Sequence, residues 1–305
     1  MKQSAEGDQE QAEERHTRHH PRIDGKSATS RLLLACPDRP GLIAAVSGFL
    51  AAAGLNIVDA DQHSSGEGRF FMRMVFDSAS DAERPGLYRR FEEELAGPLR
   101  MDFSFAESEE PKRVAIMVSQ EDHCLSDLLW RWRSGELGAD VVAVLSNHER
   151  HREQVTSLGL PFHHVPVEAG RRTEAEERAL ALVEGVDLLV LARYMQILSA
   201  EFLERLGAPA INIHHSFLPA FVGADPYGRA HERGVKLIGA TAHYVTEDLD
   251  AGPIIDQDVT RVSHRDEVED LVRIGRDIER LVLSRAVKAH IEDRVLLDGD
   301  RTIVF

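Results

Sequence analysis

Side chains that can act on a carbonyl group gather between residues 210 and 250. The segment A-I-N-I-H carries Asn212 and His214, T-A-H-Y carries His243, and the acidic turn E-D-L-D ends in Asp250. An amide donates a hydrogen bond without any change of protonation, which suits the stabilisation of an oxyanion. An imidazole or a carboxylate can exchange a proton with the reacting groups. This combination of residues is typical of an enzyme active site.

The short apolar segment around Asn212 predicts a strand. Asn212 and His214 are two residues apart, so their side chains project from the same face of that strand. His215 projects from the other face, and we leave it out of the predicted site. His243 lies on a second strand that leads into the acidic turn, where it could hold Asp250. Strand ends of an α/β sheet usually carry the chemistry.

Each of these residues also has a simpler structural explanation. Asn212 at a strand end could form a turn, His214 could be a hydrogen-bonded core histidine, and Asp250 in D-A-G could shape a turn. Asp248 could be the catalytic acid in place of Asp250. The matched order and spacing over this stretch favour the catalytic interpretation.

Composition narrows the classes of function. The 305 residues favour two domains, and 43% hydrophobic residues suffice for folded cores. A net charge of −16 argues against a nucleic-acid partner. Cys36 and Cys124 lack the spacing of a disulfide framework or a metal site, and we predict no bound metal. Without a membrane-length apolar run or a signal-like N-terminus, we expect a soluble, cytoplasmic protein with no membrane partner.

The first third of the chain predicts a tail and a small domain. Residues 1–29 are polar and without periodicity, so we expect a disordered tail. Residues 30–107 follow the order strand, helix, strand, strand, helix, strand, the ferredoxin-like βαββαβ arrangement. Glu107–Arg113 is a charged segment with a proline, which we interpret as the linker to a second domain over residues 108–305.

The segments C-P-D-R-P-G-L-I and N-I-V-D-A-D-Q-H resemble an ACT domain, a small regulatory module. The resemblance implies an amino-acid effector near Asp38, Gly41 and Asn56, and a homo-oligomer formed through the sheets. Asp38 could instead cap the following helix, with Gly41 shaping its start and Asn56 a strand entry.

The second domain predicts a Rossmann-like, mostly parallel sheet. Short apolar segments alternate with amphipathic ones, which is typical of parallel strands joined by helices. Thr173 and Glu176 predict a capping box, and Gly207 a helix end. The turn S-Q-E-D-H-C-L-S-D contains no glycine and so argues against a phosphate-binding loop.

The segments L-A-R-Y-M-Q-I-L-S, I-N-I-H-H-S-F-L-P-A-F and L-I-G-A-T-A-H-Y-V-T-E-D-L-D-A-G-P-I-I resemble the folate-dependent formyltransferase family. The ACT-like module and E-D-H-C-L-S-D-L-L-W-R-W resemble its deformylase members. The resemblance implies that water cleaves 10-formyltetrahydrofolate into formate and tetrahydrofolate, with the folate as substrate and no cofactor. Asn212 would stabilise the oxyanion, His214 would stabilise it or protonate the leaving nitrogen, and Asp250 would be the base. We expect burial or a nearby anion to raise the pKa of Asp250.

The resemblance also implies a pterin pocket between two segments. Its expected substrate-binding residues are Met195, Gln196, Ile197, Leu198, His243, Thr246, Glu247 and Leu249. Two residues beside it, Asp225 and Gly228, depart from the family pattern.

Two other functions remain open. One is formyl transfer to an amine, as in glycinamide ribonucleotide formyltransferases, although the glycine-free turn argues against a phosphate-bearing acceptor. The other is an amino-acid sensor whose second domain is inactive.

Overall fold

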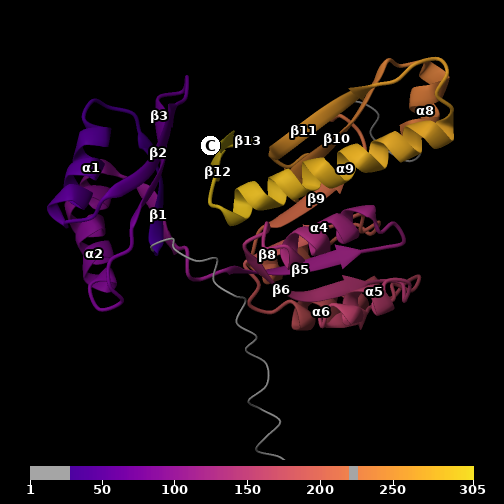
Figure 1. The fold of residues 1–305 in the computed structure, drawn as a ribbon, viewed down its shortest axis with the longest axis horizontal. Helices are drawn as coiled ribbons and strands as arrows, with labels where there is room; N and C mark the ends of the chain where they lie inside the picture. Colours follow the sequence, from indigo (N-terminus) through magenta and orange to yellow (C-terminus); the bar gives the residue numbers. More distant parts are fainter. Residues whose placement is uncertain (1–27, 220–225) are drawn as a thin grey trace, which may run out of the picture.

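The computed structural model describes residues 28–219 and 226–305, which form a small α/β unit followed by a larger one (Figure 1). The predicted fold class is confirmed. Most of the predicted tail lies outside the described residues, and Thr29, its expected last residue, already begins the first strand.

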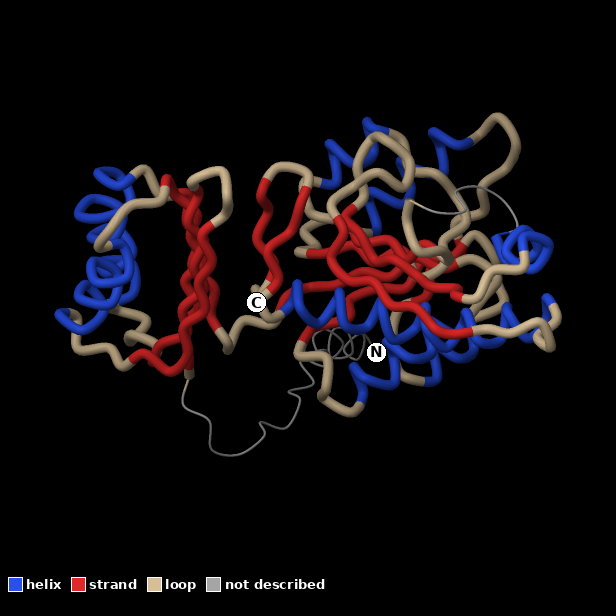
Figure 2. Tube along the Cα trace, turned by 90° about the horizontal axis from the view of Figure 1, so that it is seen from above, coloured by secondary structure: helices blue, strands red, loops and turns tan. Residues whose placement is uncertain are grey.

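The first unit is the expected ferredoxin-like arrangement. Its elements are β1 (Thr29–Pro37), α1 (Leu42–Ala52), β2 (Ile57–Ser64), β3 (Arg69–Asp77), α2 (Arg84–Phe91), the π-helical turn η1 (Glu92–Ala96), α3 (Gly97–Leu99) and β4 (Asp102–Glu107). The strand order is β2-β3-β1-β4, and each pair is antiparallel. Helices α1 and α2 cover one face of this sheet (Figure 2), because Leu32 and Leu34 of β1 point towards them into a buried core.

The start of α1 differs from the prediction. The residue at the N-cap is Gly41, not Asp38, and no side chain caps the helix there. Gly41 has a φ of 92°, a left-handed conformation that glycine adopts with little strain. The chain therefore turns at Pro40–Gly41 ahead of the helix. Asp38 precedes the N-cap residue Gly41 and does not cap the helix. Gly54 follows the helix end with a φ of 76°, as expected.

The second unit alternates strands and helices. Its elements are β5 (Lys112–Val118), α4 (His123–Arg133), β6 (Ala139–Ser146), α5 (Arg152–Ser157), β7 (Phe162–His164), α6 (Arg172–Leu182), β8 (Leu188–Leu191), α7 (Ala200–Leu206), β9 (Ala210–His214), α8 (Pro226–Arg233), β10 (Leu237–Tyr244), β11 (Ile254–Arg261), α9 (Val268–Ile291), β12 (Val295–Asp298) and β13 (Arg301–Val304).

The central sheet of this unit has the order β11-β10-β9-β8-β5-β6-β7. Strands β5 to β9 pair in parallel, whereas β10 pairs antiparallel with both β9 and β11. Ile116 and Val190 pack with α4 and α9 on one face, and Met117 and Leu189 pack with α6 and α7 on the other. Burial on both faces explains the continuous apolar runs of these strands.

Side-chain capping also departs from the prediction. Helix α6 has Arg171 at its N-cap and no side-chain cap, so the expected Thr173 and Glu176 capping box is wrong. The Glu176 carboxylate instead accepts hydrogen bonds from the Ser199 N–H (2.9 Å) and hydroxyl (2.6 Å). Ser199 in turn caps α7 by accepting from the Phe202 N–H. Gly207 ends α7 in the left-handed conformation, as expected.

The C-terminal hairpin β12–β13 lies between the two units (Figure 1). Its Leu296 forms a small buried cluster with Ala35 and Phe71 of the first sheet. Arg73, also of that sheet, donates to the Glu292 and Asp293 carbonyls that follow α9. The C-terminal end of α9 therefore lies against the first unit, and the helix runs from there along the second unit towards α8 (Figure 1). Within the described residues, no helix is long and apolar enough to cross a membrane.

Candidate active site

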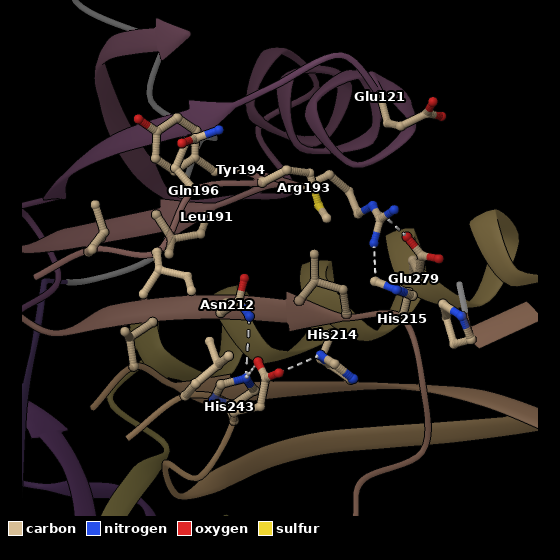
Figure 3. Close-up of a pocket in the computed structure, with 18 of the residues that line it drawn as sticks. Glu121, Leu191, Arg193, Tyr194, Gln196, Asn212, His214, His215, His243 and Glu279 are labelled. Carbon is tan, nitrogen blue, oxygen red and sulfur yellow. Dashed lines mark hydrogen bonds and ion pairs between the residues drawn. The ribbon is translucent and has the colours of Figure 1, made fainter. Parts of the chain in front are cut away.

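A cavity of about 610 Å³ opens at the carboxyl ends of β8 and β9 (Figure 3). The predicted site residues that line it are Asn212, His214, Asp250, Met195, Gln196, Ile197, Leu198, His243, Thr246, Glu247 and Leu249. The structure thus brings together every catalytic and substrate-binding residue predicted for the second domain. Asp248, the alternative acid, lines the cavity as well.

His214 and Asp250 form a pair within this cavity. The His214 Nδ1 atom lies 3.2 Å from Asp250 Oδ2, and both side chains are largely buried. His214 Nε2 is buried and has no hydrogen-bond partner among the described residues. Because the two ring nitrogens have separate roles, the pairing through Nδ1 makes Nε2 the nitrogen that could exchange a proton.

The expected raised pKa of Asp250 is wrong. His214, and then the more distant His243, hold the pKa of Asp250 well below its usual range, and they outweigh the opposite effect of burial. The carboxyl is therefore ionised at neutral pH and is a weak base. Its backbone has a φ of 55°, unusual for a non-glycine residue, which turns the side chain back towards the two histidines.

Asn212 and His243 face each other across the antiparallel pair β9–β10. The His243 Nδ1–H donates to the Tyr244 carbonyl (2.8 Å), so Nε2 is left as an acceptor for the Asn212 amide at 3.3 Å. His243 Nε2 is farther from Asp250 Oδ1, at 3.7 Å. His243 therefore orients Asn212 more directly than it holds Asp250.

The turn that carries Asp250 requires a glycine. A Cβ atom on Gly252 would lie 1.8 Å from the Tyr244 carbonyl oxygen. This is the carbonyl that orients His243, so close packing of the turn fixes Asp250 and His243 together.

Part of the cavity lining is apolar and open. Met195 and Ile197 are each 58% exposed and Leu249 is 61% exposed, although all three line the cavity. This exposure excludes core packing as the role of Met195 and Ile197. An exposed apolar wall facing polar groups suits a flat heterocyclic ligand.

Sequence analysis missed a second polar group in the same cavity. Glu279 of α9, 1% exposed, contacts His123 (2.8 Å), Tyr227 (2.6 Å) and Arg193 (3.3 Å). Burial raises the pKa of Glu279, but its hydrogen bond with His123 and the charge of Arg193 outweigh that effect, and its pKa is lowered. His215, which strand alternation placed away from the site, also lines the cavity. It does so because the chain turns at the end of β9.

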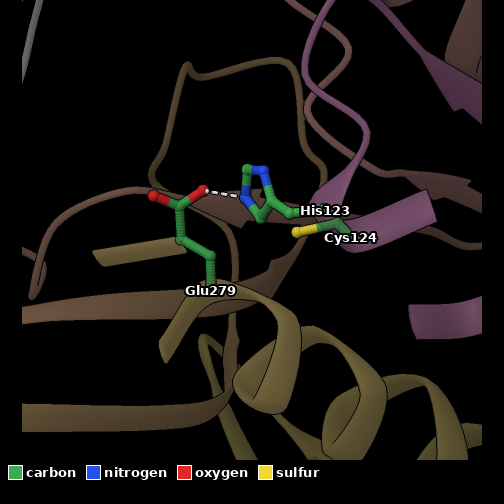
Figure 4. Close-up of side chains that lie close together, drawn as sticks. All are labelled: His123, Cys124 and Glu279. Atoms are coloured by element: carbon green, nitrogen blue, oxygen red, sulfur yellow. Dashed lines mark hydrogen bonds and ion pairs between the residues drawn. The ribbon is translucent and has the colours of Figure 1, made fainter. Parts of the chain in front are cut away.

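His123, Cys124 and Glu279 offer ligand atoms within 4.8 Å of one another (Figure 4). The same Glu279 oxygen that contacts His123 also lies 3.3 Å from the Arg193 Nε. The guanidinium thus already supplies the positive charge that a metal ion would bring, so this cluster does not suit a cation.

Other predicted residues lie outside the cavity or outside the described residues. Asp38 and Gly41 line a surface hollow of the first unit together with Gln62 and His63, but Asn56 does not. Asp225 falls outside the described residues. Gly228 is in α8.

Comparisons with known proteins cover both units. An ACT domain family model matches residues 30–95, and a formyl transferase family model matches residues 112–287. A glycinamide ribonucleotide transformylase 1 from Symbiobacterium toebii is 31% identical with a TM-score of 0.61, and it covers only 64% of this chain and 94% of its own length.

Two proteins of one kind match much more of the chain. The formyltetrahydrofolate deformylase of Mycobacterium tuberculosis H37Rv is 60% identical over 279 residues, 90% of this chain and 90% of that relative. The crystal structure of a formyltetrahydrofolate deformylase from Pseudomonas syringae pv. tomato has a TM-score of 0.87 and 47% identity, and covers 93% of this chain and 96% of its own. With both units matched in order and the cavity residues in place, the chain belongs to the formyltetrahydrofolate deformylase family.

Proposed function

We propose that this protein hydrolyses 10-formyltetrahydrofolate to formate and tetrahydrofolate in the cavity of the second unit. One observation supports the proposal most strongly: apolar side chains and the polar groups of Asn212, His214 and Asp250 line the same cavity of about 610 Å³. That volume is within the range of ordinary small-molecule sites. The family membership supports the same substrate.

His214 is the group best placed to move protons in this reaction. With Nδ1–H directed at the ionised Asp250, His214 Nε2 can accept a proton from water as it attacks the formyl carbon. The resulting imidazolium is stabilised by Asp250 and can return the proton to the N10 atom as the C–N bond breaks. Asp250 thus holds and orients His214, and its free oxygen can accept a hydrogen bond from the attacking water.

Asn212 stabilises the charge that develops on the formyl oxygen. One amide hydrogen is directed at His243 Nε2, which fixes the side chain and leaves the second hydrogen for the cavity. A donor held in this way needs no reorganisation when the oxyanion forms. The pterin ring would lie against Met195, Ile197 and Leu249, since these apolar side chains face the cavity from two sides.

Formyl transfer to a phosphate-bearing amine is less well supported. The described cations of the cavity are already paired, Arg193 with Glu279 and Arg276 with Glu121. A phosphate group would have to compete with these carboxylates. Water, which needs no such site, is the simpler acceptor.

The test is formate release from 10-formyltetrahydrofolate by the full-length protein, with no amine and with a chelator present. We expect turnover under these conditions, because hydrolysis needs neither an amine acceptor nor a metal. One formate should appear for each tetrahydrofolate formed. Dependence of turnover on glycinamide ribonucleotide would replace hydrolysis with transfer, and loss of turnover with chelator would add a metal.

We further propose that the first unit binds an amino acid and joins copies of the chain. Asp38 and Gly41 border a hollow that could take such an effector, and β2 is an edge strand with largely exposed side chains. Light scattering and turnover, each measured with and without added amino acids, test self-association and effector binding. A monomer whose turnover does not change with added amino acids would contradict both proposals. The buried free thiols Cys36 and Cys124 support a reducing, cytoplasmic location, which cell fractionation tests.

A further inference from the structure

Arg193 occupies an unusual backbone position at the edge of the cavity. It follows β8 with a φ of 62°, in the left-handed region that non-glycine residues rarely adopt. Its carbonyl accepts the Ser119 N–H, and its side chain is only 14% exposed. Such a conformation persists only where surrounding contacts hold it, and such positions cluster at functional sites.

The Arg193 guanidinium bridges two groups that the proposed reaction does not use. Its Nε lies 3.3 Å from Glu279 Oε2, and its Nη1 contacts His215 Nδ1 (Figure 3). A guanidinium only donates hydrogen bonds, so His215 Nδ1 must accept and the ring proton lies on Nε2. The contact is therefore compatible with a neutral His215 and not with an imidazolium.

His215 stacks on the ring that exchanges the proton. The His214 and His215 ring centroids are 5.1 Å apart, with an interplanar angle of 17°. A second positive charge at this distance would oppose protonation of His214, whereas a neutral ring only supports its orientation.

Other charges around His215 favour the neutral form on balance. Burial and then Arg193 lower the pKa of His215 to about 4, and the adjacent His214 acts in the same direction. Glu279 from α9 and Asp250 from the turn after β10 act in the opposite direction. Tyr227 of α8 has its ring centroid 6.2 Å away and directs its hydroxyl to Glu279.

We propose that Arg193 is a positioning residue for the hydrolysis: anchored by Glu279, it keeps His215 neutral and fixed against His214, so that the reaction proton is confined to His214. This inference rests on the proposed function for its catalytic consequence. The state of His215 in the resting protein does not depend on that function.

Nuclear magnetic resonance of ring-labelled histidines tests the resting state directly, with His215→Phe identifying the signals. In the parent protein we expect His215 to carry its proton on Nε2 and not to titrate above about pH 5. A parent His215 that is protonated on Nδ1, or that titrates near its ordinary value of about 6.5, would overturn the proposal without any variant of Arg193.

Arg193→Met tests the catalytic consequence. We expect the titration of His215 to move up towards its ordinary value of about 6.5 without reaching it, because burial, the larger cause of the lowered pKa, remains. One pH unit below the raised titration only about a tenth of the variant would hold a neutral His215, so we expect kcat there to be about tenfold lower than in the parent, with KM within about threefold. The deficit should shrink above about pH 7.5, where His215 is neutral again. A deficit that stays constant with pH would indicate a purely structural role and overturn the proposal.

Three further variants separate the causes. Arg276→Met removes another arginine of the same cavity and should leave the His215 titration unchanged. Arg193→Lys keeps a charged donor and should retain a neutral His215. Titration of His215 near 6.5 in this variant would contradict the proposal. The same measurement replaces the Arg193→Met test if Arg193→Met does not fold. In a His215→Phe background, Arg193→Met should add no pH-dependent deficit. If the parent protein released no formate at all, the proposed function would be wrong, whatever the titration of His215 shows.

Discussion

Two histidine–carboxylate pairs lie in the same cavity, and they differ in what each carboxylate contacts. His214 contacts Asp250 through Nδ1, its Nε2 is buried without a partner among the described residues, and Asp250 also approaches His243. His123 contacts Glu279 through Nε2, and its Nδ1 is likewise buried without a partner among the described residues. Glu279 also holds Arg193 and Tyr227. The second carboxylate therefore holds neighbouring side chains in place, whereas the first pair is linked through His243 to Asn212 and is the one that we expect to act on a ligand.

The largest expected effect is at the first pair. His214→Ala should lower kcat by about 100- to 10,000-fold, the range for the loss of a general acid–base, while tetrahydrofolate binding persists. His123→Ala is the matched control, since it breaks the other pair in the same cavity, and it should cost less than about tenfold. Stopped-time formate assays with calorimetric binding measure both. Equal losses of kcat in the two variants would contradict the proposal that only the first pair takes part in the chemistry.

Asn212 should come next. Asn212→Ala removes the proposed oxyanion donor and should lower kcat by about 100- to 1000-fold. His243→Ala leaves the amide in place but unoriented, so we expect a smaller loss. Steady-state kinetics of the two variants decide the order, and a larger loss in His243→Ala would mean that the histidine itself touches the reacting atoms.

The second pair should matter more for stability than for chemistry. Glu279→Gln leaves the Arg193 charge buried and uncompensated, which typically destabilises a protein by about 3–5 kcal/mol. We expect a clear drop in the urea midpoint and a smaller loss of kcat than in His214→Ala. An unchanged midpoint would show that Glu279 is not the anchor that its contacts suggest.

The smallest effect concerns pH. Because the folded pKa of Asp250 is below its unfolded value of about 3.9, its stabilising contribution is complete above about pH 4 and is lost as the pH falls through the folded value. Asp250→Asn should therefore lower the unfolding free energy at pH 7, and the difference from the parent should narrow below about pH 4. If the difference in unfolding free energy widened on acidification, folding would raise the pKa of Asp250 and not lower it.

Sequence patterns predicted the order of elements and the residues of the first pair. Asn212 and His214 could be found from strand alternation, and Asp250 from the family resemblance. The alternation rule failed at His215 because β9 ends at His214 and the chain then turns. The lowered pKa of Asp250 depends on histidines from two different strands, which meet only in the folded sheet.

Glu279 lies far along the chain from its partners, so spacing could not connect it to them. One signal was available. Gly275, Glu279, Val282 and Ala286 follow helical spacing and are all buried, so a carboxylate interrupts an apolar face of α9. A Cβ atom on Gly275 would lie 1.9 Å from the Tyr227 hydroxyl, and this close packing brings that hydroxyl to Glu279. A glycine and an acid one turn apart on a core-facing helix side thus marked the second pair.

Hydrolysis in isotopically labelled water is the most direct test of the claim that the first pair activates water. The parent protein is incubated with 10-formyltetrahydrofolate and glycinamide ribonucleotide in water enriched in oxygen-18, and the products are analysed by mass spectrometry. The account predicts formate carrying one oxygen atom from the solvent, and an unmodified amine. Formylated amine without labelled formate would contradict it.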